Sequence, residues 1–267
     1  MRRRSPPFSL PALALLTATS YAAPARALSP PDDEAKSLPC RPTIACTADI
    51  VKPGSFELET GMLYRNFGGT RQWTIPFLAK LSVTNVLQIQ IGSNGFTTLV
   101  DSSPAVHFLD NLTFGMKLHV LDQGKLAPAL AFSGAVGVPV MTAQPGFTPD
   151  FDAFATAYVT KDFGPLHADL NLGINDWAVG DATIAQEWVA LALSVPLPHP
   201  FGAMVENYYF SDALPFSGKD GGCLFALSLT PRPWLVFDFG GDIGYFPETR
   251  SYSAFVGMTV VPFLLWH

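Results

Sequence analysis

Residues 112–121, LTFGMKLHVL, alternate between two kinds of side chain. Every second position from Leu112 to Val120 is apolar, whereas the positions between them include Lys117 and His119. Successive side chains of a β-strand point to opposite faces, so this run predicts a strand with one apolar face and one face that carries charge.

The same kind of alternation recurs along the chain in short runs that clusters of Gly, Pro, Asn and Asp separate. We predict twelve strands. They span roughly residues 55–65, 72–82, 86–93, 111–121, 126–140, 151–161, 166–175, 185–196, 201–210, 221–230, 234–245 and 251–261. No internal window is apolar for long enough to form a membrane-spanning helix.

The connections between these strands alternate in length. One set is short, as at 82–85, 122–125 and 162–165, and the other includes the longer 93–110 and 141–150. Short turns on one side, long loops on the other and an even strand number are typical of bacterial outer-membrane barrels. We therefore predict an all-β fold, an antiparallel transmembrane β-barrel of about 12 strands, closed because a bilayer excludes open sheet edges.

A secreted, water-soluble sandwich or lipocalin-like barrel shows the same alternation with its apolar face turned inward. Composition favours the membrane barrel, because only 14% of the residues are charged, against about 25% in typical soluble domains. The net charge of -6 argues against nucleic acid as a partner.

The N-terminus resembles an export signal, with Arg2, Arg3 and Arg4 before an apolar stretch at 8–16 and small residues up to Ala27. We expect residues 1–27 to be a cleaved signal peptide, 28–54 a periplasmic tail and 55–267 the barrel domain. In an oxidising compartment Cys40 and Cys46 are expected to form a small disulfide loop, which leaves Cys223 unpaired.

Several segments resemble, in order, an outer-membrane transporter family named after the meta-pathway of phenol degradation. They are VKPGSFELETGMLY, FGMKLHVL, LAPALAFSGAVGVPV, HADLNLGIN, MVENYYF and LSLTPRPWLVFDFGGDIGYF, and the similarity covers residues 51–261. The resemblance implies an outer-membrane barrel assigned to transport, and it supplies no catalytic residues. The pair Cys40 and Cys46 departs from the family pattern.

Eleven polar residues are expected to face the barrel lumen. They are Glu57, Glu59, Lys80, Lys117, His119, His167, Asp169, Asn171, Glu206, Asp238 and Asp242. One interpretation is a lining that selects a solute. The other, which we favour, is a network of ion pairs and hydrogen bonds that fills a narrow interior. Apolar residues of the longest loop, Phe96, Val100, Val106 and Phe108, are candidates for a partial plug.

The sequence does not favour catalysis or cofactor binding. The histidines lack metal-ligand spacing, and no motif places Ser194 or Ser228 with His167 as a hydrolase would need. Aromatic residues near the long loops, among them Tyr64, Trp73, Tyr208 and Tyr252, are expected to form an interfacial girdle.

We therefore expect an outer-membrane channel that passively passes small, apolar or aromatic solutes, with no metal and no cofactor. The alternative is a closed structural or ligand-binding barrel of the cell envelope. The expected partners are outer-membrane lipid, a small-molecule solute and the barrel-assembly machinery, and no oligomeric state follows from the sequence.

Overall fold

The computed structural model describes residues 36–67, 69–100, 105–140, 151–179, 182–212, 218–246 and 251–266. Within these ranges the chain forms thirteen β-strands. They are β1 (Ser55–Phe67), β2 (Thr70–Ser82), β3 (Leu87–Val100), β4 (Val106–Leu109), β5 (Leu112–Leu121), β6 (Ala129–Val138), β7 (Asp152–Phe163), β8 (Leu166–Val179), β9 (Ala182–Pro196), β10 (Phe201–Phe210), β11 (Asp220–Arg232), β12 (Leu235–Gly244) and β13 (Ser251–Leu264). The predicted signal peptide, residues 28–35 of the predicted tail and the predicted loop 141–150 lie outside the described residues.

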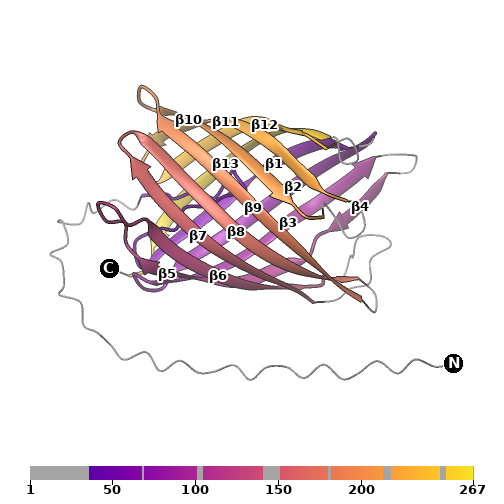
Figure 1. Cartoon of the computed structure of the whole chain (residues 1–267), viewed down its shortest axis with the longest axis horizontal. Coiled ribbons are helices and arrows are strands. Elements are labelled where there is room, and N and C mark those ends of the chain that lie inside the picture. The colour runs from indigo at the N-terminus through magenta and orange to yellow at the C-terminus, as the bar shows by residue number, and fades with distance from the viewer. Residues whose placement is uncertain are drawn as a thin grey trace, which may run out of the picture. The chain divides into compact units, whose positions relative to one another are not determined.

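Twelve of these strands form a closed antiparallel barrel (Figure 1). Each strand pairs with its neighbours in the chain, and β13 pairs with β1 to close the ring. The predicted fold class is confirmed, and each of the twelve predicted runs coincides with a barrel strand.

The strand β4 departs from the prediction. It pairs with residues 96–99 of β3, whereas β5 pairs with residues 87–92 of β3. Residues 96–99 and 106–109 therefore extend the barrel wall as a hairpin. The proposed plug from this loop is wrong, because backbone pairing holds Phe96 and Val106 in the wall.

The two faces of the wall have opposite chemistry. Phe114 and Met116 are 43% and 54% exposed on the outward face of β5, whereas Lys117 is 2% exposed and His119 is 8% exposed on the inward face. The largest fully buried side chains include Lys117, Glu57, Glu59 and Glu206. A water-soluble barrel would bury its large apolar residues and expose its charges, so the soluble alternative does not fit.

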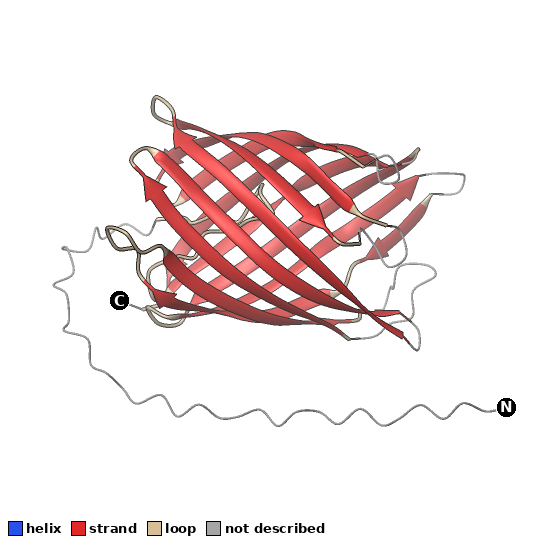
Figure 2. Cartoon of the chain, in the orientation of Figure 1, coloured by secondary structure: helices blue, strands red, loops and turns tan. Residues whose placement is uncertain are grey.

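Short connections between strands gather at one end of the barrel, on the left of Figure 2. The connections 83–86, 122–128, 164–165, 197–200 and 233–234 lie at one end, which we call the short-turn end. The chain enters and leaves the barrel there, because Leu265 donates a backbone hydrogen bond to Gly54, and Ser37 donates one to Pro233. The opposite end is called the long-loop end. No helix in the described ranges has the length and apolar character that a membrane span requires.

Outward-facing aromatic side chains gather at the long-loop end. The rings of Tyr64 and Trp73 lie 4.7 Å apart, and Tyr252 lies 6.3 Å from Tyr64. Tyr208 does not belong to this girdle, because its side chain is buried inside the barrel, where its hydroxyl donates to Asp242.

Candidate functional site

Residues 36–54, which we call the lumen segment, precede β1, and the part from Ser37 to Asp49 contacts the inner face of the barrel. Within thirteen residues, from Ser37 to Asp49, the segment bonds to buried side chains on β1, β10, β8, β7 and β5. Strands β1 and β8 lie on opposite sides of the ring, so a segment that contacts both must cross the lumen. Sequence reasoning treated residues 28–54 as a tail that precedes the fold, and it did not anticipate these contacts.

The first anchor of the lumen segment is an acidic pair on β1. Glu57 accepts hydrogen bonds from the hydroxyl of Ser37 and the backbone N–H of Leu38, at 2.9 and 2.7 Å. Glu59 accepts from the backbone N–H groups of Cys40 and Arg41, at 3.0 and 2.9 Å. Both acids are fully buried.

Lys80 on β2 forms ion pairs with both acids. Its ammonium group contacts Glu57 and lies 2.5 Å from Glu59, and it also donates to the carbonyl oxygen of Leu38 at 2.8 Å. A buried ammonium group needs such partners, because an unpaired charge is costly away from water. Three of the predicted residues are thus brought together around the start of the lumen segment.

The second anchor holds the disulfide loop, residues 40–46. The Cys40–Cys46 disulfide predicted from the sequence is present. Glu206 on β10 accepts from the N–H groups of Ile44 and Ala45 at 2.8 and 3.0 Å. Asn171 on β8 accepts from the N–H of Cys46 at 2.7 Å and donates to the carbonyl of the same residue at 2.8 Å. The loop therefore meets acceptors from two further strands.

The third anchor lies on β5. Lys117 donates to the carbonyl oxygens of Thr47 and, at 3.2 Å, Asp49, and its ammonium group lies 4.4 Å from the ring centre of Tyr158. His119 places Nδ1 3.0 Å from the carbonyl oxygen of Ala48. Lys117 and His119, which the sequence predicts on the polar face of residues 112–121, thus both bind the backbone of the lumen segment.

Thr160 on β7 forms a fourth anchor that sequence reasoning missed. Its hydroxyl oxygen accepts from the N–H of Ala48 at 2.7 Å, and the hydroxyl donates to Asp169 at 2.5 Å. The only sequence signal is the inward position of Thr160 in the alternation of β7, and a threonine there is not distinctive.

His167 links this network to the short-turn end. Its Nδ1 lies 2.6 Å from Asp162, and its Nε2 lies 3.1 Å from Asp169. Ser194 is opposite His167 in the register of β8 and β9, but both ring nitrogens of His167 already contact carboxylates. The arrangement therefore leaves no nitrogen to activate the serine, as a hydrolase would require.

The last two predicted residues lie on β12. Asp238 is buried, and its Oδ1 lies 3.8 Å from Nη2 of Arg41. Asp242 accepts hydrogen bonds from the hydroxyls of Tyr208 and Ser253. Within the described residues, no group of three or more His, Cys, Asp or Glu side chains is placed to hold a metal ion.

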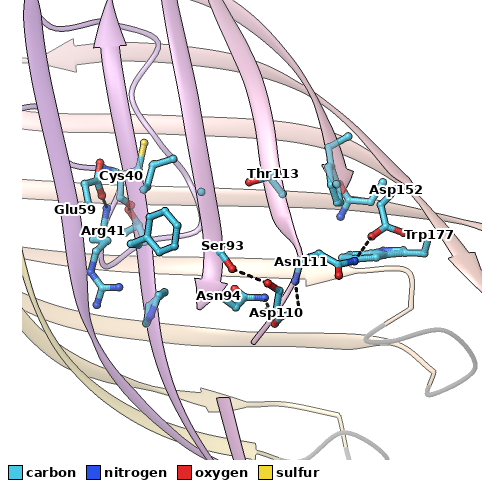
Figure 3. A pocket seen from close by; sticks show the side chains of 18 residues that line it. Cys40, Arg41, Glu59, Ser93, Asn94, Asp110, Asn111, Thr113, Asp152 and Trp177 are labelled. Atoms are coloured by element: carbon cyan, nitrogen blue, oxygen red, sulfur yellow. Dashed lines mark hydrogen bonds between the residues drawn. The ribbon is translucent and has the colours of Figure 1, made fainter. Parts of the chain in front are cut away.

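A pocket of about 420 Å³ lies above the lumen segment, toward the long-loop end (Figure 3). Cys40, Arg41 and Glu59 lie on one side of it, and Asp110, Asn111, Asp152 and Trp177 lie on the other. Phe154 adds further aromatic surface. The pocket therefore combines aromatic walls with carboxylate and amide groups, as small-molecule sites do.

The comparisons with known proteins support the fold. No family model matches the chain, and no curated protein matches it. Among solved structures, an outer membrane channel from Pseudomonas putida F1 is 8% identical, with a TM-score of 0.58, and the match covers 80% of this chain and 97% of that one. The NanC porin is also 8% identical, with a TM-score of 0.56, and the match covers 76% of this chain and 98% of the porin. At this identity the likeness shows the fold alone, which is that of outer-membrane channels and porins.

Proposed function

We propose that the chain is an outer-membrane channel that passes small, apolar or aromatic solutes down their gradient. The observation that carries the proposal is the pocket in the polar lumen, with Phe154 and Trp177 in its walls, inside a barrel with an apolar outer face. The fold shared with a porin and an outer membrane channel supports the same function, and so does the resemblance to the phenol-degradation transporter family.

The location follows from the same reasoning. The apolar outer face fits outer-membrane lipid, and the predicted signal peptide would export the chain to the periplasm, where the barrel-assembly machinery inserts such barrels. The short-turn end would then face the periplasm, and the pocket would face the cell exterior.

The predicted lumen residues have a structural role in this proposal. Glu59, Glu206 and Lys117 each bind the backbone of the lumen segment, so they hold the closed state and do not line a free pore. Passage requires the lumen segment to move, which exchanges these hydrogen bonds for bonds to water.

A second candidate is a closed structural or ligand-binding barrel. The observation that favours it is the set of anchors on opposite walls, which together bond to the backbone from Leu38 to Asp49. A segment held in this way would be a permanent part of the interior.

Conductance measurements separate the two candidates. The purified full chain is reconstituted into planar bilayers, together with a Glu206→Ala variant that weakens one anchor. A channel gives discrete openings that become more frequent in the variant. Silence of both proteins, with a melting temperature that rises when a solute is added, would instead support the binding barrel. Uptake of aromatic solutes by cells that lack and regain the protein then tests the solute class.

A further inference from the structure

Three residues form a row across the inner wall at one register level. Gly61 on β1 is opposite Gly257 on β13, and Gly257 is opposite Asp238 on β12. The two glycines leave a shallow slot in the wall, and the buried carboxylate of Asp238 closes one end of it.

The side chain of Arg41 from the lumen segment fills this slot. A Cβ atom added to Gly61 would lie 2.6 Å from Arg41 Nη2, and one added to Gly257 would lie 2.5 Å from Nε. Real Cβ atoms do not approach other atoms so closely. The guanidinium therefore lies directly against both glycines, and a Cβ atom at either position would displace it.

The Arg41 side chain fills the slot but does not form a close ion pair with Asp238. Arg41 Nη2 lies 3.8 Å from Asp238 Oδ1, whereas a bidentate arginine–carboxylate pair has N···O distances of about 2.7–2.9 Å. Among the described residues, neither carboxylate oxygen of Asp238 accepts a hydrogen bond, and neither Arg41 Nε nor the hydroxyl of Thr259 has a partner. The backbone N–H of Arg41 donates a hydrogen bond to Glu59. This attachment limits how closely the guanidinium can approach Asp238.

We propose that Gly61, Gly257 and Asp238 form a binding site for the guanidinium group of a small molecule, and that Arg41 occupies the site as a tethered stand-in. A planar group with several N–H donors lies flat on the glycines and pairs with the carboxylate. Arg41 also lines the 420 Å³ pocket, so a ligand that displaces it would reach the slot from the pocket. The inference goes beyond the proposed function, because binding here does not require passage.

A binding assay on the full chain in detergent micelles tests the site. The Arg41→Gln variant has an empty slot, and its melting temperature is measured with methylguanidinium or tetramethylammonium at equal millimolar concentration. Tetramethylammonium carries the same charge but has no N–H donor. We expect methylguanidinium to raise the melting temperature of the variant, and neither cation to change that of the unaltered chain, whose slot Arg41 fills.

The matched control adds Asp238→Asn to Arg41→Gln. We expect methylguanidinium affinity to fall by about 30-fold or more, the effect of removing one partner of a buried charge pair. Equal stabilisation by both cations, or unchanged affinity in the double variant, would overturn the proposal. If Arg41→Gln does not fold, Arg41→Lys leaves the slot partly empty and takes its place in the same assay. The assay requires no conductance, so a silent bilayer would leave its result unaffected.

Discussion

Asn171 and the backbone of Cys46 exchange two hydrogen bonds across 125 residues of sequence, at 2.7 and 2.8 Å. The side-chain amide has the donor and acceptor of a peptide group, so it pairs with Cys46 as a neighbouring strand would. This pairing satisfies both the N–H and the C=O of Cys46 inside the barrel, and it fixes the end of the disulfide loop against β8.

Replacing Asn171 with Leu should release the lumen segment more often. The change leaves the N–H and C=O of Cys46 without partners, and each unsatisfied buried group costs about 1–3 kcal/mol. We expect the rate at which dithiothreitol reduces the Cys40–Cys46 disulfide to rise about fivefold or more. The matched control is Asn207→Leu, because Asn207 is exposed on β10, away from the lumen segment. Equal reduction rates in the two variants would contradict this role of Asn171.

Glu206→Gln should also destabilise the closed state, in which the lumen segment is held inside the barrel. The carboxylate accepts the N–H groups of Ile44 and Ala45, whereas a glutamine has one acceptor oxygen and turns an NH₂ group toward a donor. Hydrogen bonds to charged groups contribute about 1.5–3 kcal/mol each, so the open state should become more populated. Single-channel recordings should show shorter closed times, with Glu187→Gln as control because Glu187 is exposed on β9. Identical closed times in both variants would count against the anchor.

The disulfide should itself stabilise closure. It closes the loop from Cys40 to Cys46, and a cross-link over so short a loop contributes about 2 kcal/mol through the entropy of the open chain. We expect a double Ser variant of these cysteines to open more often than the unaltered chain, with Cys223→Ser as the control that removes the remaining cysteine. If added reductant increases the openings of Cys223→Ser but not of the double variant, the disulfide is the element that responds. A reductant that has no effect on either protein would refute the prediction.

The sequence predicted the strands of this barrel better than the lumen segment inside it. Alternation assigns Lys117 and His119 to one face and Met116 to the other, because the period of a strand is fixed by its backbone. Residues 36–54 have no such period, and their contacts are made largely by backbone N–H and C=O groups that every sequence has. No pattern therefore indicated that Ile44 would meet Glu206. One signal was available: Glu57, Glu59 and Glu206 lie at inward positions, and buried acids need donors from somewhere.

The assignment of the outer face to lipid has a direct test in the exchange of Met116 for Arg. Met116 is 54% exposed near the middle of β5, and Leu126 is 90% exposed in the connection 122–128. If water surrounded the barrel, arginine would be tolerated at both positions, since both are surface sites. In a bilayer, arginine at the midplane costs about 2–4 kcal/mol, and the cost falls to about 0–1 near the interface. Folding into lipid vesicles, followed by the heat-dependent shift in gel mobility, should therefore be impaired for Met116→Arg and unaffected for Leu126→Arg. Equal folding of the two variants would mean that the apolar face of β5 does not contact lipid.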